Sequence, residues 1–243
     1  MALILPDRCF IIAEAGTNHA ATNMHDAFKN AMTYVLRARE AKADAIKFQW
    51  FDKSNAELFC PLPGDKQRWP RWADSYLHID DWIQIKRFAE ACGLVFLAST
   101  FQHSTVKWLN ELGVVATKVA SRAANTFPYE DAPKPYLISC GMMIPIPQKG
   151  AYLLQCESKY PSTDTWEGPN DEGDYPYGMI GFSDHSGSPW RAIDAISRGC
   201  KLIEVHFHLD ERDAGPDLPA SLTLDELKLV CEASHEFAAL RKS

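Results

Sequence analysis

The 243-residue chain lacks the features of membrane-spanning, disulfide-rich secreted and nucleic-acid-binding proteins. No apolar run approaches the roughly 20 residues that a membrane-spanning helix requires, and residues 1–8 show no signal-peptide pattern, so we expect no membrane partner. Seven cysteines form no CxxC pair, which favours free thiols in a reducing cytoplasm. Basic residues do not cluster and the formal net charge is -7, which indicates no nucleic-acid partner.

Short apolar runs followed by polar residues or glycine alternate with amphipathic segments along most of the chain. The runs predict eight strands, at 10–15, 45–48, 95–99, 116–120, 136–139, 152–156, 179–182 and 202–206. Helical periodicity is clear at 25–41, 80–92, 104–112, 189–198 and 224–240. The alternation predicts an α/β fold, a (β/α)8 TIM barrel. Because no linker or repeat divides the sequence, we expect one domain over residues 1–243.

The middle of the chain has fewer helical segments than a regular (β/α)8 barrel. The connections at 122–135, 140–151 and 157–178 are rich in proline, glycine or aspartate and show no helical period. We therefore expect helices four to six to be reduced or missing. The outer faces of strands four to six would then be poorly covered, and we expect a second subunit of a homo-oligomer to cover them.

Two histidines, His185 and His206, each close an apolar run in the last third of the chain. In a (β/α)8 barrel the chemistry lies at the carboxyl ends of the strands, where two neighbouring imidazoles could bind one metal ion. The alternative is a pair of buried histidines satisfied by hydrogen bonds.

Two lysines, Lys47 and Lys118, lie within apolar strands, where a charge is costly unless it is paired. Hydroxyl side chains stand at the ends of the neighbouring strands. Lysines ringed by hydroxyls indicate a site for a small, doubly charged anion, such as one with a phosphate and a carboxylate. Alternatively, each lysine pairs with a structural carboxylate, for which Glu14 is available.

Eight segments, in order along the chain, resemble motifs of the sialic acid synthase family. They are IAEAGTNH at 12–19, ADAIKFQ at 43–49, KVAS at 118–121, SCGM at 139–142, YP at 160–161, GFSDH at 181–185, EVHF at 204–207 and GPDLPASL at 215–222. Since each falls at an expected strand end and together they span nearly the whole chain, the resemblance supports the barrel.

The resemblance implies an enzyme that condenses phosphoenolpyruvate with an aldehyde or sugar acceptor, giving a 2-keto acid and phosphate. It implies a divalent metal, Mn²⁺ or Mg²⁺, that polarises the aldehyde oxygen. By position, the metal ligands would be His185 and His206, with His206 also counted as catalytic. Phosphoenolpyruvate would be bound by Lys47, Thr100, Lys118, Ser121, Ser139 and Ser183. The acceptor would be bound by Glu14, Gln49, Tyr160 and Asp217, with Glu14 or Asp217 carrying protons.

These implied roles have structural alternatives. Glu14 could be only the counter-ion of Lys47, Tyr160 a packing aromatic at a turn, and Asp217 the side chain that stabilises a Gly-Pro-Asp turn.

The sequence also departs from the family around the acceptor. Arg122 and Ala123 stand where the family has Gly-Glu, Leu218 replaces a histidine, and the tryptophan-rich stretch 50–82 alters the rim. The family's C-terminal antifreeze-like domain has no counterpart in this sequence. Since the expected anion and metal residues match, we expect phosphoenolpyruvate to meet a different acceptor, smaller, anionic or phosphorylated, which Arg122 would bind. Alternatively, Arg122 is a solvated rim residue, or the barrel is a non-catalytic or partner-dependent subunit that binds a small anion.

Overall fold

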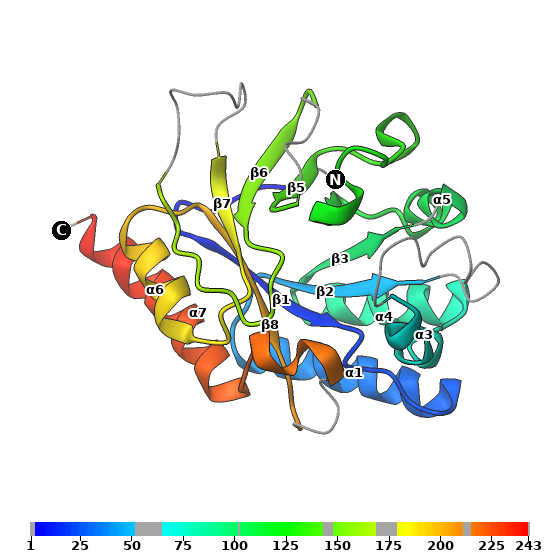
Figure 1. Ribbon diagram of the computed structural model, residues 1–243. Coiled ribbons are helices and arrows are strands. Elements are labelled where there is room, and N and C mark those ends of the chain that lie inside the picture. Colours follow the sequence, from blue (N-terminus) through cyan, green and yellow to red (C-terminus); the bar gives the residue numbers. More distant parts are fainter. Residues whose placement is uncertain are drawn as a thin grey trace.

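The computed structural model describes residues 3–51, 65–101, 103–142, 148–168, 179–210 and 215–242. Its strands form a closed parallel barrel in chain order, because β1 pairs with both β2 and β8 (Figure 1). The strands are β1 (Phe10–Gly16), β2 (Ala45–Trp50), β3 (Val95–Thr100), β4 (Thr117–Val119), β5 (Tyr136–Cys140), β6 (Ala151–Cys156), β7 (Met179–Asp184) and β8 (Leu202–Phe207). A short β9 (Ser221–Leu222) adds to β8. The predicted (β/α)8 barrel is confirmed.

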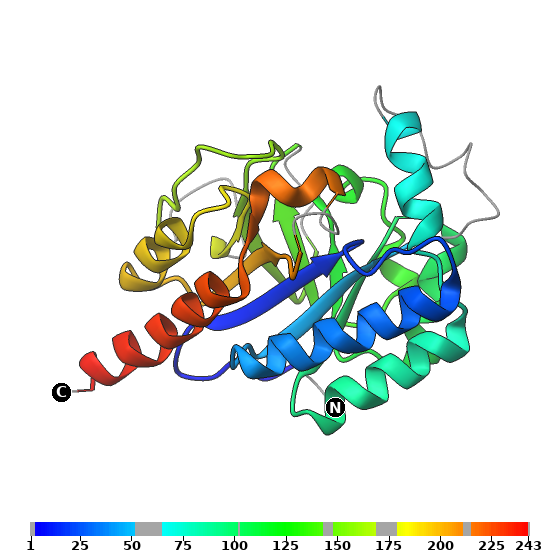
Figure 2. The ribbon, with the colours of Figure 1, turned by 90° about the horizontal axis from the view of Figure 1, so that it is seen from below.

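Helices cover the barrel on two sides. One group is α1 (Met24–Glu40), α3 (Asp65–Asp74), α4 (Ile79–Ala91) and α5 (His103–Leu112), and the other is α6 (Pro189–Ser197) and α7 (Leu224–Leu240). Figure 2 shows α1 and α4 side by side beneath the strands. Side-chain caps begin two of these helices: Asn23 accepts a hydrogen bond from the Asp26 amide, and Thr223 forms a capping box with Glu226. Among the described residues, no helix is long and apolar enough to cross a membrane.

The barrel interior changes from apolar to polar along each strand. The lower layer is apolar and contains Phe10, Ile12, Ala45, Leu97, Ala116, Leu137, Leu154 and Leu202. Two residues further along each strand, on the same face, the side chains become Glu14, Lys47, Ser99, Lys118, Ser139, Cys156, Ser183 and Glu204. On β7 the residue in the apolar layer is Gly181, where an added Cβ would lie 2.9 Å from both Leu154 and the Leu202 carbonyl oxygen. The apolar layer therefore closes the barrel below and supports a polar site above.

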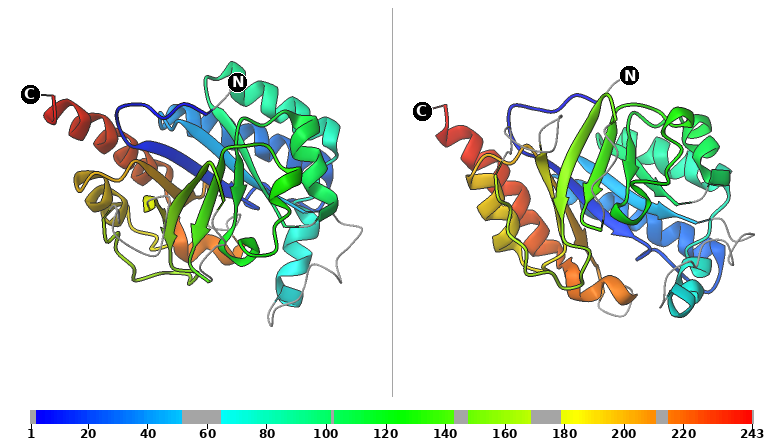
Figure 3. Two further views of the ribbon diagram at one scale, coloured as in Figure 1. Left: turned by 90° about the horizontal axis from the view of Figure 1, so that it is seen from above. Right: turned by 45° about the horizontal axis from the view of Figure 1, so that its top comes forward.

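Between β4 and β7, the described residues contain no α-helix, as the sequence predicted. Only the short 3₁₀ turns η2 (Ser121–Ala123) and η3 (Tyr129–Asp131) lie between β4 and β5. Figure 3 shows the helices flanking the barrel, with the green strands β5 and β6 facing the viewer between them. Parts of the connections 140–151 and 157–178 lie outside the described residues.

The outer faces of these strands are nevertheless well covered, so the expectation that they are exposed is wrong. On β5, Tyr136 is 2% exposed, and its hydroxyl donates a hydrogen bond to the Tyr129 carbonyl. The ring centroids of the two tyrosines lie 5.1 Å apart. Over β6, the Gln155 amide donates to Asp164 and Thr165 at 3.0 and 2.9 Å, and Trp166 is 1% exposed. Irregular chain with buried aromatic rings therefore replaces the missing helices. A partner subunit is not needed there, and the homo-oligomer stays a prediction.

We expect Trp166→Ala to lower the free energy of unfolding by about 3–5 kcal/mol, because it opens a cavity over β6. The matched control is Trp190→Ala on α6, where the ring is 67% exposed, so its loss costs little. Urea denaturation of both variants measures the difference. Equal effects would show that Trp166 does not seal the outer face of the barrel.

Candidate active site

A cavity of about 320 Å³ opens at the carboxyl ends of the strands. Most side chains predicted from the sequence line it: Glu14, Lys47, Gln49, Lys118, Ser121, Arg122, Ser139, Tyr160, Ser183, His185, His206 and Asp217. Thr100 is the exception, since it does not line the cavity although it is buried. Adjacent residues of a strand point to opposite faces, and it is Ser99 that points inward. The structure therefore replaces Thr100 with Ser99 among the cavity hydroxyls.

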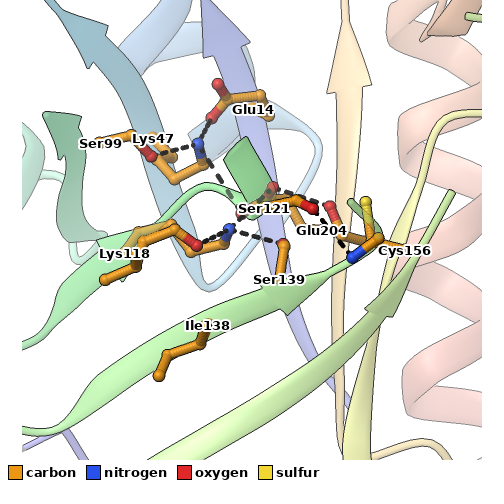
Figure 4. A network of polar contacts seen from close by, with 12 residues as sticks. Glu14, Lys47, Ser99, Lys118, Ser121, Ile138, Ser139, Cys156 and Glu204 are labelled. Atoms are coloured by element: carbon orange, nitrogen blue, oxygen red, sulfur yellow. Dashed lines mark hydrogen bonds and ion pairs between the residues drawn. The ribbon is translucent and has the colours of Figure 1, made fainter. Parts of the chain in front are cut away.

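The floor of the cavity is a buried network of two lysines and two carboxylates. The Lys47 amine lies 2.7 Å from Glu14 and 3.8 Å from Glu204, and it donates to the Ser99 hydroxyl at 3.0 Å. The Lys118 amine lies 3.7 Å from Glu204. Figure 4 shows both amines directed into the barrel with the carboxylates beside them. Each lysine thus has the carboxylate partner that the alternative interpretation expected, and each still lines the cavity.

Hydroxyl groups complete this floor. The Lys118 amine donates to the Ser139 hydroxyl at 2.8 Å, and the Ser183 hydroxyl donates to Glu204 at 3.0 Å. Glu204 thus contacts both lysines and a hydroxyl, although our sequence analysis assigned it no role. Its signal was present in the sequence: it lies two residues before His206 on the same strand, and therefore on the same inward face.

The two carboxyl groups of the floor have opposite pKa shifts. Burial raises the pKa of Glu14 to about 7, against the opposing charge of Lys47, and the charge of Glu204 adds to the rise. Burial also acts on Glu204, but the charges of Lys118 and Lys47 outweigh it and lower the pKa to about 2. Glu204 therefore remains a fixed anion, whereas Glu14 can exchange a proton near neutral pH.

His185 and His206 meet at one side of the cavity, with ring centroids 5.4 Å apart. The Glu157 carbonyl oxygen lies 2.8 Å from His185 Nδ1, which places the proton on Nδ1 and makes Nε2 the acceptor nitrogen of the ring. The Tyr160 hydroxyl lies 3.2 Å from that Nε2, and its ring stacks on the imidazole at 4.4 Å. Tyr160 is therefore part of the site and not merely a packing aromatic.

The histidines offer nitrogen ligands for a metal. Burial lowers the pKa of both, and for His206 the charge of His185 lowers it further, so both rings are neutral near pH 7. No group of three or more His, Cys, Asp or Glu suited to hold a metal ion occurs within the described ranges. Two imidazoles are only part of a metal's ligands, so a metal held by this pair would take its other ligands from substrate and water.

Ser121 fixes the loop after β5 at the edge of the cavity. Its hydroxyl oxygen accepts hydrogen bonds from the amides of Gly141 and Met142 at 2.9 and 2.5 Å. A Cβ at Gly141 would lie 2.4 Å from the Cys156 carbonyl oxygen, so only glycine allows the loop to approach β6 this closely. The two amides are therefore held facing the Ser121 hydroxyl.

The mouth of the cavity includes side chains that the sequence analysis missed: Phe51, Arg68, Trp72, Phe101, Met142 and Ser158. Arg68 and Trp72 lie on α3, a helix that we did not predict because Pro70 interrupts its pattern. The only sign in the sequence was the tryptophan-rich stretch.

Curated relatives of this chain include synthases. The chain is 30% identical to human N-acetylneuraminate-9-phosphate synthase over 90% of its own length and 67% of the relative's. It is 29% identical to N,N'-diacetyllegionaminic acid synthase of Legionella pneumophila over 93% of its length and 71% of the relative's.

Solved structures agree in fold. The crystal structure of N-acetylneuraminic acid (sialic acid) synthetase from Leptospira borgpetersenii serovar Hardjo-bovis, in complex with citrate, superposes with a TM-score of 0.76 at 22% identity. The match covers 97% of this chain and 86% of that one. The NeuB family model matches residues 34–243, so the chain belongs to the NeuB family, as the motifs predicted.

Proposed function

We propose that the chain condenses phosphoenolpyruvate with an aldehyde acceptor, giving a 2-keto acid and phosphate. Its family and its synthase relatives place it among phosphoenolpyruvate-dependent, carbon–carbon bond-forming transferases. The observation that carries the proposal is the buried floor, where Lys47 and Lys118 line a cavity together with serine hydroxyls. This arrangement suits a small substrate with one phosphate and one carboxylate.

The floor binds and orients phosphoenolpyruvate. Lys47 and Lys118 supply positive charge, and Ser99, Ser139 and Ser183 supply hydroxyl groups to its oxygens. In the first step the carbon–carbon double bond attacks the aldehyde carbon through C3, and positive charge develops at C2. The fixed anion Glu204, buried between the two lysines, stabilises that charge.

Glu14 is the residue that carries the proton in this reaction. Water adds to C2 and gives up a proton to the Glu14 carboxylate, which passes it to the alkoxide oxygen of the former aldehyde to form a hydroxyl. The bond between C2 and the phosphate oxygen then breaks, the proton of the new C2 hydroxyl goes to the departing phosphate, and the ketone remains. A carboxyl with a pKa of about 7 is suited to this exchange near neutral pH.

His185 and His206 would hold a divalent cation, Mn²⁺ or Mg²⁺, through their neutral rings. Such a cation polarises the aldehyde oxygen. The Glu157 carbonyl fixes the orientation of the His185 ring, and Tyr160 packs on its face. Gln49, Tyr160 and Asp217 line the cavity and would contact the acceptor. Arg122 and Ala123 stand where the family pattern has Gly-Glu. This change favours an altered acceptor.

We expect His206→Ala to reduce phosphate release from phosphoenolpyruvate by about 10²-fold or more, because it removes one of the two candidate metal ligands. The assay uses Mn²⁺ with a panel of aldoses, amino sugars and phosphorylated aldehydes. His235→Ala, at an exposed position of α7, is the matched control and keeps wild-type release.

Two outcomes of that assay count against the proposal. Unchanged release in His206→Ala would remove the histidine pair from the reaction. If the wild-type protein binds phosphoenolpyruvate but no acceptor supports release, the chain is a non-catalytic or partner-dependent barrel that binds a small anion.

We expect kcat/KM to rise with pH through about 7 and to level off above it, because Glu14 must be ionised to accept a proton. Glu14→Gln removes this rising limb of the pH profile and lowers kcat by about 10²–10⁴-fold. Ionisation of phosphoenolpyruvate itself affects both proteins equally, and Glu232→Gln, exposed on α7, keeps the wild-type profile. If the limb persists in Glu14→Gln, another group carries the proton.

A further inference from the structure

The two lysines on the floor of the cavity have different surroundings. The Lys47 amine forms a direct ion pair with Glu14 at 2.7 Å. The Lys118 amine lies 3.7 Å from the Glu204 carboxylate, which is beyond hydrogen-bond distance. It donates instead to the neutral Ser139 hydroxyl at 2.8 Å (Figure 4). Lys118 is therefore held less firmly in its charged form than Lys47.

The charges around the two amines add to this difference. Burial acts to lower the pKa of Lys47, but the charges of Glu14 and Glu204 outweigh it and raise the pKa. Burial also lowers the pKa of Lys118, where the charge of Glu204 only partly offsets it and the charge of Lys47 lowers it further. The groups that act on or are acted on by the Lys118 charge are Glu14, Lys47, Cys156, Glu204 and the neutral imidazoles of His185 and His206.

This environment is typical of a nucleophilic lysine. A buried amine that lies beside a second cation gives up its proton more readily than an ordinary lysine, and the free amine attacks carbonyl carbon atoms. Lys118 also lines the cavity, so a bound substrate can reach it. Lys47, which stays charged, can pair with a carboxylate next to the carbonyl. A 2-keto acid offers both groups on adjacent carbon atoms.

We propose that Lys118 forms a Schiff base with 2-keto acids whose carboxylate pairs with Lys47. The Lys118 nitrogen bonds to C2, and two of its protons leave with the carbonyl oxygen as water. The product is an iminium ion, with a carbon–nitrogen double bond in place of the carbonyl. The reaction goes beyond the proposed condensation, because it uses no phosphoenolpyruvate.

The floor suits this iminium ion. It carries the same single positive charge as the ammonium group that it replaces, so Glu204 keeps a cation beside it. The Ser139 hydroxyl, next to the Lys118 amine, can donate a hydrogen bond to the carbonyl oxygen during the attack. The Schiff base therefore leaves the charge balance of the buried network unchanged.

With pyruvate, the Schiff base gives a further activity. The iminium ion makes the C3 hydrogens acidic, and one of them passes as a proton to the Glu14 carboxylate, which leaves a neutral enamine. Return of a proton from solvent restores the iminium ion, and water then releases pyruvate. The protein would thus exchange the methyl hydrogens of pyruvate with solvent.

The first test is reductive trapping with pyruvate and sodium cyanoborohydride, which converts an iminium ion into a stable secondary amine. Intact mass spectrometry measures the added groups, and peptide mapping locates them. We expect the label on Lys118 before it appears on Lys47 or on Lys107, an exposed lysine of α5. Label on Lys47 or on exposed lysines, with none on Lys118, overturns the proposal.

Two variants assign the reaction to its residue. We expect Lys118→Arg to reduce labelling by about tenfold or more, because a guanidinium keeps the positive charge but is not a nucleophile. Lys107→Met is the matched control and keeps the wild-type labelling at Lys118. Thermal melting checks that both variants are folded, and the labelling map of the wild-type protein does not depend on either.

The second test follows the methyl signal of pyruvate in D₂O by proton NMR. We expect the wild-type protein to deplete this signal faster than Lys118→Arg by about tenfold or more. Equal rates for the two proteins would remove Lys118 from the exchange.

The outcomes separate this inference from the proposed function. If Lys118 is not labelled while phosphoenolpyruvate and an aldehyde release phosphate, the synthase stands and the Schiff-base lysine fails. If Lys118 is labelled while no acceptor supports phosphate release, the Schiff-base lysine stands and the synthase fails.

Discussion

The site depends on four charged groups buried together inside the barrel. Glu14, Lys47, Lys118 and Glu204 are each no more than 4% exposed. A buried charge is tolerated only beside an opposite one, and removing one partner from such a group commonly costs about 3–5 kcal/mol. The network therefore maintains the charge of the lysines while leaving them in the wall of the cavity.

The same network sets the protonation of its members. Glu204 lies between two ammonium groups and remains ionised, whereas Glu14 is held close to the point at which it exchanges a proton. Two carboxyl groups on neighbouring strands thus acquire different chemistry from their surroundings. One can act as a permanent charge and the other as a proton carrier.

Much of the architecture could be predicted because it repeats. Apolar runs that end in polar residues located all eight strands, and the barrel topology placed Lys47, Lys118 and both histidines at one end. Glu204 and Ser99 could have been found by the same alternation, and Thr100 excluded by it.

Features made by contacts between distant segments were harder to predict. The covering of β5 and β6 depends on Tyr129 and Trp166, which lie in segments without periodicity. Helix α3 contains Pro70, so its local sequence gave no helical signal, and its position depends on packing against η4 (Gly215–Ala220). Without α3, Arg68 and Trp72 could not be placed at the mouth.

On every strand, an inward-facing position of the apolar layer stands two residues before a group of the polar site. A change in the floor of the cavity therefore disturbs the part of the molecule that holds the barrel closed. Most of the residues at the cavity mouth come from segments outside the strands, namely α3, η2 and the residues just after β2 and β3. Natural variation can thus exchange one helix or one turn and alter what enters the barrel while its base remains intact. Within such a lineage, substrate choice can therefore change through residues at the cavity mouth. The residues of the floor change less readily, because the stability of the barrel depends on them.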